Sequence, residues 1–343
     1  MDDLLSTTID IIHKPFGSSR TIKREDSTGN TKRLSKTLRI NQVPVYVTSL
    51  NGGTQINIRC CPLKVLQGHN VFGTNQVKKL GHKLIVMVLK ELGINATQDQ
   101  LCAWKVGEFQ IDEIHLTHRF PVSGFGLRRV LAHIHRYSSK YLRPSFIDKG
   151  IGVTLKAPHL EWIFYDKYIE FVDKRKKEQK YLKVVAGDNA ERTGKLLQRS
   201  ASKSIRAELK LSKEYLKDNV LDRGKHWTVG KAIEVFTLEL NRLCLGQIPS
   251  LPEMPMLYKQ IVDPKLRSIV ILWANGEDLS NHYGRTSLQK YRKAIRDEHG
   301  FDVLKDQPVL KPASINLLDI FDSTNMLTGF PKWVQKFPEL AFR

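Results

Sequence analysis

The stretch VPVYVTSLNGGTQINIRCC, residues 43–61, indicates the fold class of this 343-residue chain most directly. Two strand-like runs, Val43–Leu50 and 54–61, flank Asn51-Gly52-Gly53. Asparagine and glycine tolerate the positive φ angles that a tight hairpin turn requires. We therefore predict an antiparallel hairpin at this place.

Further strands and helices are predicted outward from this hairpin. Ser204–Leu211 alternates apolar and polar residues, which indicates a half-buried strand with one solvated or functional face. Strand-like runs also cover residues 5–12, 109–120, 153–156 and 162–167, and helical patterns cover 74–92, 127–141, 227–245, 263–273 and 287–299. Strands in hairpin order mixed with helices predict an α+β fold, in which a central antiparallel sheet is flanked by helices.

The domain organisation follows from changes in composition. We predict one domain over residues 1–222 and a mostly helical domain over 223–343, with a DNA-binding or accessory role and a proline-bearing linker at 247–255. Within the first domain, residues 14–36 are polar and basic and are predicted to form a mobile loop. Residues 173–199 are expected to form a surface helix and connector. No internal repeat is visible.

Charge indicates the class of partner. The chain has 55 Lys and Arg against 35 Asp and Glu, a net charge of +20, so a polyanion is the expected partner, and nucleic acid is the first candidate.

No apolar run approaches the roughly 20 residues of a membrane span, and the acidic N-terminus does not resemble a signal peptide. The four cysteines lack C-x-x-C spacing, so no zinc or redox motif is predicted and reduced thiols in a cytoplasm are expected.

The segment KVLQGHNVFG, residues 64–73, lies between a predicted strand and a predicted helix. It carries two glycines and the polar residues Gln67, His69 and Asn70. The start of the following helix offers free N–H groups that suit a phosphate. A packed connector with Thr74 as helix cap explains the same residues equally well.

The segment IHLTH, residues 114–118, is the candidate metal-binding strand. Alternation places Glu113, His115 and Thr117 on one face and His118 on the other, so both histidines could bind one metal only if the strand is irregular. Asp112 is a further candidate, from the opposite face. Surface or helix-capping histidines are the alternative.

Two further segments carry reactive side chains. In WIFYDKYIE, residues 162–170, Tyr165 shares a face with Lys167 if the chain is extended, or with Tyr168 if it is helical. A core tyrosine beside a snorkelling lysine is the alternative. On 204–211, Glu208 is a hard oxygen ligand suited to Mg²⁺ or Mn²⁺, and Arg206 on the same face suits phosphate. A cross-strand ion pair would explain these two residues as well.

Together, KVLQGHNVFG, Tyr165-x-Lys167-x-x-Glu170 and Arg206-x-Glu208 resemble the filamentous bacteriophage replication initiators of the gene II and gene X type. The resemblance implies Tyr165 as nucleophile and Lys167 beside the scissile phosphate. It also implies a divalent metal, Mg²⁺ or Mn²⁺, at His115 and Glu208, with His118 as a further ligand. In the 64–73 and 204–211 segments, the implied DNA-binding residues are Lys64, Gln67, His69, Asn70 and Arg206. The chain departs from the family in having Glu113-Ile114-His115 where an acidic residue typically follows Arg-Ile or Arg-Val.

The implied activity is that of a rolling-circle nicking-joining endonuclease, with residues 1–222 as the origin-nicking domain. It would nick the plus-strand origin of double-stranded circular phage DNA and later rejoin the displaced strand. Host DNA polymerase and helicase are the implied partners, in the cytoplasm of the bacterial host. A weaker resemblance covers residues 273–303.

Within residues 273–303, a basic helix could contact DNA through Lys290, Arg292 and Lys293, or could be a solvated face.

Three other functions of the protein stay open. They are a non-catalytic sequence-specific DNA-binding regulator, a plasmid relaxase or transposase of similar chemistry, and an RNA-binding structural protein.

Overall fold

The computed structural model describes residues 2–22, 31–122, 127, 130–131, 134–135, 143–147, 152–202, 204–243, 245, 261–274, 277–299, 302–304 and 317–342. The strands are β1 (Asp2–Asp10), β2 (Ser18–Ile22), β3 (Thr31–Ile40), β4 (Val43–Leu50), β5 (Gln55–Cys60), β6 (Gln110–Pro121), β7 (Arg143–Ile147), β8 (Gly152–Lys156), β9 (Leu160–Asp166) and β10 (Ser204–Leu211). The helices are α1 (Pro62–Gln67), α2 (Val77–Leu92), α3 (Gln98–Val106), α5 (Lys167–Asp173), α6 (Arg175–Ala186), α7 (Ala190–Ala201), α8 (Lys213–Asp218), α9 (Val229–Arg242), α11 (Pro264–Ala274), α12 (Arg285–His299) and α13 (Leu318–Phe321).

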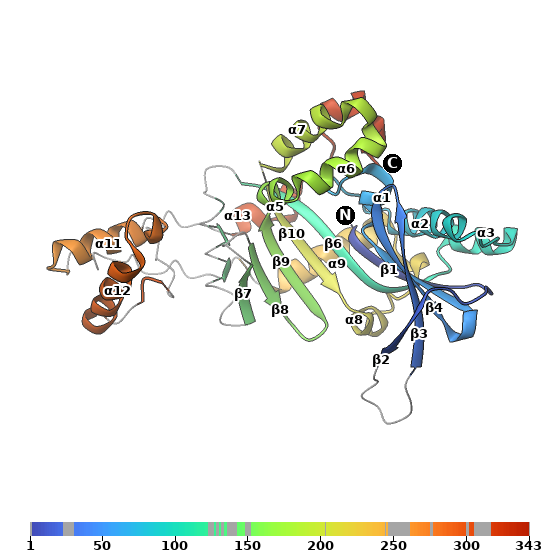
Figure 1. Cartoon of the computed structure of the whole chain (residues 1–343), viewed down its shortest axis with the longest axis horizontal. Helices are drawn as coiled ribbons and strands as arrows, with labels where there is room; N and C mark the ends of the chain where they lie inside the picture. Colours follow the sequence, from blue (N-terminus) through green and yellow to red (C-terminus); the bar gives the residue numbers. More distant parts are fainter. Residues whose placement is uncertain are drawn as a thin grey trace.

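One ten-stranded sheet organises the described chain (Figure 1). Its strand order is β2-β3-β4-β5-β1-β6-β10-β9-β8-β7, and each neighbouring pair is antiparallel. The α+β prediction, with a central antiparallel sheet, is confirmed.

The predicted hairpin is the pair β4–β5. Leu50 lies opposite Gln55, and the turn residues Asn51, Gly52 and Gly53 all have positive φ. At Gly53 a Cβ atom would lie 2.3 Å from the carbonyl oxygen of His13, so only glycine fits there. This turn therefore forms as the sequence predicts.

One face of the sheet is apolar and carries the main core. Alternate residues of the central strands point into it, among them Ile114 of β6, Leu209 of β10 and Phe164 of β9, all 0% exposed. Helices α2, α9 and α13 cover this face and contribute Leu84, Phe236 and Phe321 to the same core. Alternation with a period of two thus separates this face from a polar one.

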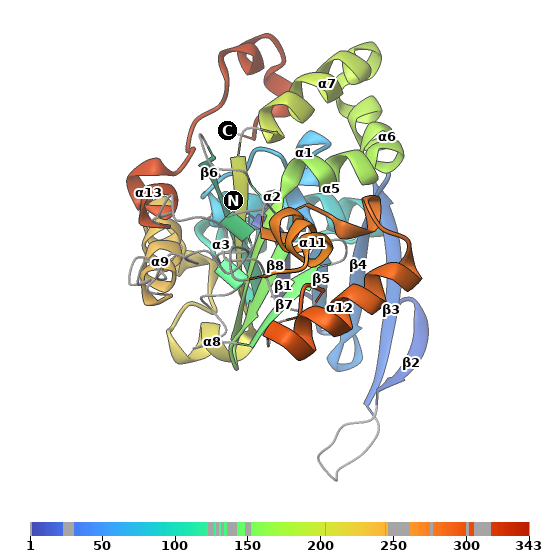
Figure 2. The same cartoon turned by 90° about the vertical axis from the view of Figure 1, so that its left-hand side faces the viewer.

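The polar face is more covered than the sequence predicts. Arg206 and Glu208 of β10 are 0% and 7% exposed, so the expectation of a half-buried strand is wrong. Figures 1 and 2 both place α6 and α7 at one end of the sheet. Leu182 and Leu197 from these helices are fully buried in a second apolar cluster. Residues 173–199 are therefore a packed helical layer as well as a connector.

The described part of residues 14–36 is largely strand, so the prediction of a mobile loop is wrong for that part. Ser18–Ile22 and Thr31–Ile40 pair as β2 and β3 at the edge of the sheet, and β3 also pairs with β4. Basic residues are common on edge strands because they discourage further pairing, so polarity alone is a poor sign of a loop. Residues 23–30 lie outside the described residues.

The main core continues past residue 222. Helix α9 contributes Ala232 and Phe236 to it, and α13 contributes Ile320 and Phe321. Residues 334–341 join the second cluster, beside α6 and α7. Within 223–343, the residues between Ile261 and Val303 form an apolar cluster of their own around Trp273, Leu288 and Ile295.

The helix predicted over 127–141 falls mostly outside the described residues. Leu127, Val130, Leu131, Ile134 and His135 are helical. Within the described ranges, no helix has the length and hydropathy needed to cross a bilayer.

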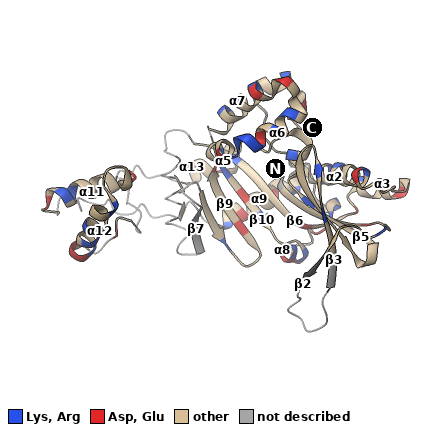
Figure 3. Ribbon diagram, viewed as in Figure 1, with Lys and Arg blue, Asp and Glu red and all other residues tan. Residues whose placement is uncertain are grey.

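Figure 3 shows Lys and Arg on α2, α6, α7 and α12, and acidic residues near the middle of the sheet. The middle of the sheet is thus locally acidic although the chain as a whole carries a net charge of +20.

A packing prediction concerns Gly81 of α2. A methyl group there would lie 2.5 Å from the buried ring of Phe109. We expect Gly81→Ala to lower the free energy of unfolding by about 1–3 kcal/mol, because an overpacked core must shift. Denaturant titration measures this change.

Gly230→Ala is the matched control in an exposed helix position, where the nearest atom is Thr228 Oγ1 at 3.9 Å. Alanine favours helix, so this variant should gain up to about 1 kcal/mol. Equal unfolding midpoints for the two variants would contradict the packing around Phe109.

Candidate active site

Three adjacent strands bring Tyr165, Glu208 and His115 to one face of the sheet. In the register of β6, β10 and β9, Arg119, Arg206 and Tyr165 form one row across the strands. Thr117, Glu208 and Ile163 form the next row, followed by His115, Lys210 and Glu161. Residues directly opposite one another point to the same side of a sheet, so these side chains share the polar face.

The Glu208 carboxylate accepts hydrogen bonds from both His115 and Tyr165. Its Oε1 accepts a hydrogen bond from His115 Nδ1 at 2.8 Å, and its Oε2 accepts one from the Tyr165 hydroxyl at 3.3 Å. The other ring nitrogen of His115, Nε2, donates to Glu113 Oε1 at 2.9 Å. The expectation that His115 and Glu208 lie on the same face thus agrees with the geometry.

The charge state of His115 follows from these contacts. Burial alone would lower its pKa, but the hydrogen bonds to Glu113 and Glu208 outweigh burial and raise the pKa to about 9. The hydrogen bond from His115 in turn lowers the pKa of Glu113. At neutral pH a positively charged imidazole therefore lies between two carboxylates.

The carboxylate of Glu208 and the imidazole of His115, which are in direct contact, are donor types that can bind a divalent ion. Both nitrogens of His115 are occupied by carboxylates, so a metal would have to replace a proton on one of them. Among the described residues, no three His, Cys, Asp or Glu side chains are arranged around one metal position.

His118 lies on the other face of the sheet. Its ring centroid is 4.4 Å from that of Phe236, and burial lowers its pKa well below the usual value. The pairing of β6 with β10 is regular from Ile114 to Pro121. The irregularity that would bring His118 beside His115 is therefore absent from this stretch.

The irregularity of β6 lies instead at Asp112. The register against β1 shifts between Ser6, opposite Glu113, and Thr7, opposite Ile111. Asp112 accepts hydrogen bonds from Thr8 Oγ1 at 2.6 Å and from Asn57, both residues of the polar face. The assignment of Asp112 to the opposite face is thus wrong, because a bulge places two consecutive residues on one side.

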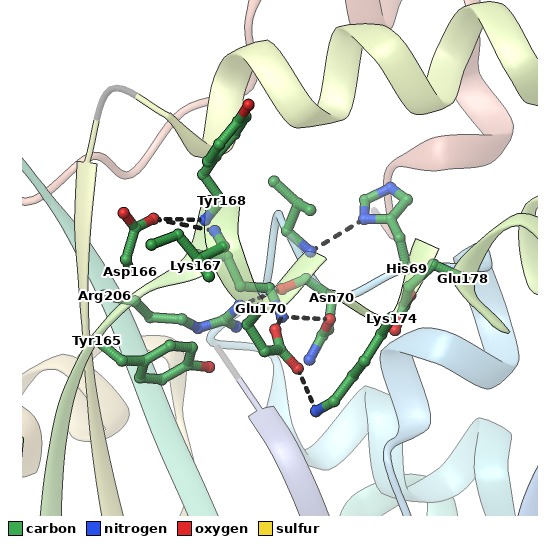
Figure 4. A network of polar contacts seen from close by, with 12 residues as sticks. His69, Asn70, Tyr165, Asp166, Lys167, Tyr168, Glu170, Lys174, Glu178 and Arg206 are labelled. Carbon is green, nitrogen blue, oxygen red and sulfur yellow. Dashed lines mark hydrogen bonds and ion pairs between the residues drawn. The ribbon is translucent and has the colours of Figure 1, made fainter. Parts of the chain in front are cut away.

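Lys167 lies where β9 ends and α5 begins. Asp166 caps the helix by accepting from the backbone N–H groups of Tyr168 and Ile169, so Tyr165 is the last strand position before the cap. The Lys167 ammonium is 1% exposed, donates to Asn70 Oδ1 at 2.9 Å and pairs with Glu170 (Figure 4). Tyr168 is 37% exposed and points away from Tyr165 (Figure 4).

Comparison with known proteins identifies the family of this chain. Residues 2–230 match the family model that describes the N-terminal part of the phage replication-associated protein, the gene II product. The chain belongs to this family of phage replication initiators. No curated protein and no solved structure matches the chain.

The KVLQGHNVFG segment, on which the resemblance to this family rests, is buried. The side-chain amide of Gln67 donates to the carbonyls of His69 and Phe72, and its Oε1 accepts from the backbone N–H of Phe342. His69 Nε2 lies 3.0 Å from the Leu340 carbonyl. These side chains hold the C-terminal residues and do not form an open phosphate site.

Asn70 links this segment to the candidate active site. Its carbonyl accepts from Arg206 Nη1 at 2.6 Å, and its side-chain oxygen accepts from Lys167. Lys64 is nearly buried and pairs with Glu178. Among the predicted DNA-binding residues, Gln67, His69, Asn70 and Arg206 are therefore buried and Lys64 is nearly buried. Asn70 positions Arg206 and Lys167.

The basic helix α12 is not part of this cluster. Figure 1 shows it apart from the sheet, beside α11. Arg292 is held by Asp302 through two hydrogen bonds of 2.7 Å, while Lys290 and Lys293 are exposed.

Sequence reasoning assigned no role to two residues of the site, Glu113 and Arg119. Both lie on the His115 face of β6, Glu113 by alternation two positions before it and Arg119 four positions after it. Alternation already places Glu113 on this face, and extending the same argument along the whole strand would have found Arg119.

A pH prediction concerns His69. Burial lowers its pKa to about 3, whereas in the unfolded chain it lies near 6.5. A depressed folded-state pKa gives stability that is present above pH 6.5 and is lost as the pH falls toward 3. We expect His69→Gln to remove part of the decline in unfolding free energy between pH 6.5 and 4, up to about 1.4 kcal/mol per pH unit.

Denaturant titrations across this range measure the slope. The exposed His159→Gln is the control and should keep the parental slope. A parental slope in His69→Gln would show that His69 is not buried neutral.

Proposed function

We propose that this protein initiates rolling-circle replication of phage DNA by cutting one strand of the plus-strand origin with Tyr165 and later rejoining the displaced strand. Membership of the replication-initiator family supports the substrate class. The observation that carries the chemistry is the Glu208 carboxylate, which is shared by the Tyr165 hydroxyl and His115.

Glu208 is suited to activate the tyrosine. The phenol needs a base to become a nucleophile, and Glu208 Oε2 already accepts its hydrogen bond. Arg206, whose guanidinium lies 6.0 Å from the Tyr165 ring centroid, offers positive charge beside the reacting oxygen.

The proposed step balances as follows. The Tyr165 oxygen attacks phosphorus and its proton passes to Glu208, while the bond between phosphorus and the 3′ oxygen breaks. The 3′ oxygen leaves and takes a proton, so the products are a 5′-phosphotyrosyl link and a free 3′-OH. Rejoining reverses the step, and because the phosphoester bond is conserved no ATP is consumed.

A divalent ion, Mg²⁺ or Mn²⁺, belongs to this proposal. Glu208 and His115 would hold it, with His115 giving up one proton. When bound, the ion polarises the phosphate and stabilises the negative charge that develops on it.

The free 3′-OH defines the partners. A host DNA polymerase would extend it, and a host helicase would unwind the duplex ahead, in the cytoplasm of the bacterial host. The net charge of +20 favours binding to the circular DNA duplex. A plasmid relaxase or transposase would use the same chemistry, but family membership favours the phage origin.

The first functional prediction separates Tyr165 from Tyr168. Tyr165→Phe removes the nucleophilic oxygen, so it should bind supercoiled origin DNA normally and produce no nicked circles. Tyr168→Phe is the matched control on the neighbouring helix and should retain most of the nicking rate. Gel analysis of nicked circles measures both.

Nicking by Tyr165→Phe at the parental rate would mean that another residue is the nucleophile, whereas DNA binding without nicking by the parent protein would leave a non-catalytic DNA-binding regulator. Loss of DNA binding in the same variant would mean that its effect is on binding and not on chemistry.

The second functional prediction concerns Glu208. Glu208→Gln keeps the size of the side chain and an oxygen acceptor but removes the base and the charged ligand. We expect nicking in Mg²⁺ to fall at least about a hundredfold, with circular dichroism unchanged. Excess chelator should abolish nicking by the parent protein.

Glu161→Gln is the matched control, because Glu161 lies on the same face and pairs with Lys210 on β10. It should nick at close to the parental rate. Equal losses in the two variants would mean that any charge change on this face impairs the protein.

A further inference from the structure

Arg119 is a buried cation for which the proposed chemistry has no role. It lies on β6, is 4% exposed, and its guanidinium is 5.0 Å from the centroid of the Phe72 ring. Its Nε has no hydrogen-bond partner. Among the residues that the structure describes, no carboxylate pairs with Arg119.

A second cation lies directly beside it. Arg206 is the cross-strand neighbour of Arg119, is 0% exposed, and donates to the Asn70 carbonyl. Burial and the charge of Arg206 lower the pKa of Arg119 to about 10. A buried arginine such as Arg119, with a second cation beside it, is costly unless an anion compensates its charge.

Tyr165 completes the same row. It lies opposite Arg206 on β9. Figure 4 shows the Tyr165 ring and the Arg206 side chain side by side, with the hydroxyl and the guanidinium at the same end. An anion attracted by the arginine pair would therefore lie next to the tyrosine oxygen.

The ring that lies over Arg119, that of Phe72, is itself 1% exposed and is packed against other aromatic rings. Phe72 contacts Phe330 and Trp333 of the C-terminal segment, each at 5.8 Å between ring centroids. Phe330 is 36% exposed. Phe330 is thus a partly exposed ring of this aromatic group, and arginines grouped with aromatic rings also bind the phosphates and bases of single strands.

We propose that Arg119 and Arg206 together bind a phosphodiester group of the DNA strand, next to Tyr165. The guanidinium groups supply planar sets of donors that match phosphate oxygens, which lysine would not. This inference rests on the proposed function for its ligand, a DNA strand, but not on the nicking step. It assigns Arg119 to DNA binding.

The test uses Arg119→Met in the full-length protein, with Arg192→Met as control. Arg192 is exposed on α7 and also lies over an aromatic ring, that of Phe337 at 5.9 Å. The probe is a single-stranded DNA oligonucleotide of mixed sequence, and affinity is measured over a tenfold range of salt.

We expect Arg119→Met to weaken oligonucleotide binding at least tenfold and to reduce the slope of log affinity against log salt by about 0.7, the value for one phosphate contact on a single strand. The melting temperature without DNA should rise by a few degrees, because an uncompensated buried charge is removed. Arg192→Met should change neither slope nor melting temperature.

If Arg119 only packs against Phe72, its replacement should lower the melting temperature and leave the salt slope unchanged. A lower melting temperature together with an unchanged salt slope in Arg119→Met would overturn the proposal. If Arg119→Met does not fold, Arg119→Lys decides, since it keeps the charge and should retain the slope while losing affinity. Parental affinity in Arg119→Lys would contradict recognition by the guanidinium fork.

Two further measurements identify the ligand and separate DNA binding by Arg119 from nicking by Tyr165. Inorganic phosphate, compared with chloride at equal ionic strength, should raise the parental melting temperature only at much higher concentration than the oligonucleotide does. Stabilisation by phosphate without any stabilisation by the oligonucleotide would exclude DNA as the occupant. Running all measurements in Tyr165→Phe removes nicking, so failure of this site and failure of the proposed nucleophile are distinguishable.

Discussion

The pairing of β10 with both of its neighbours is the constraint on which the candidate active site depends. Tyr165, Glu208 and His115 come from three strands that are far apart in the sequence, and only the antiparallel register places them together. A slip of one residue would turn Glu208 and Arg206 into the apolar core. The fully buried neighbours Ala207 and Leu209 make that slip unfavourable, so the packing of the core also aligns the polar face.

The KVLQGHNVFG segment supports this face from one side. Asn70 holds Arg206 through its carbonyl and Lys167 through its side chain. Gln67 and His69 bind the backbone at Phe342 and Leu340, which brings the C-terminal segment against α6 and α7. The motif is thus explained by buried hydrogen bonds, which are costly to leave incomplete, without requiring direct contact with DNA.

Much of this could be predicted from the sequence, since Asn51-Gly52-Gly53 between two strand-like runs predicted the hairpin at residues 43–61, and alternation put His115 on the same face as Thr117. The bulge at Asp112 could not be predicted, because it depends on pairing with β1. Burial of Arg206 and Glu208 also escaped prediction, since their partners Asn70, His115 and Tyr165 lie far from them in the sequence. The polar composition of 14–36 was misleading because an edge strand tolerates the same residues as a loop.

The central claim is that the oxygen of Tyr165 forms the covalent link to DNA. The most direct test is to trap the protein on a single-stranded origin fragment, digest the complex with protease, and locate the attached nucleotide by tandem mass spectrometry. The account predicts a nucleotide on the peptide that contains Tyr165, with fragment ions placing it on that residue. A nucleotide attached to Tyr168, or to any other side chain, would contradict it.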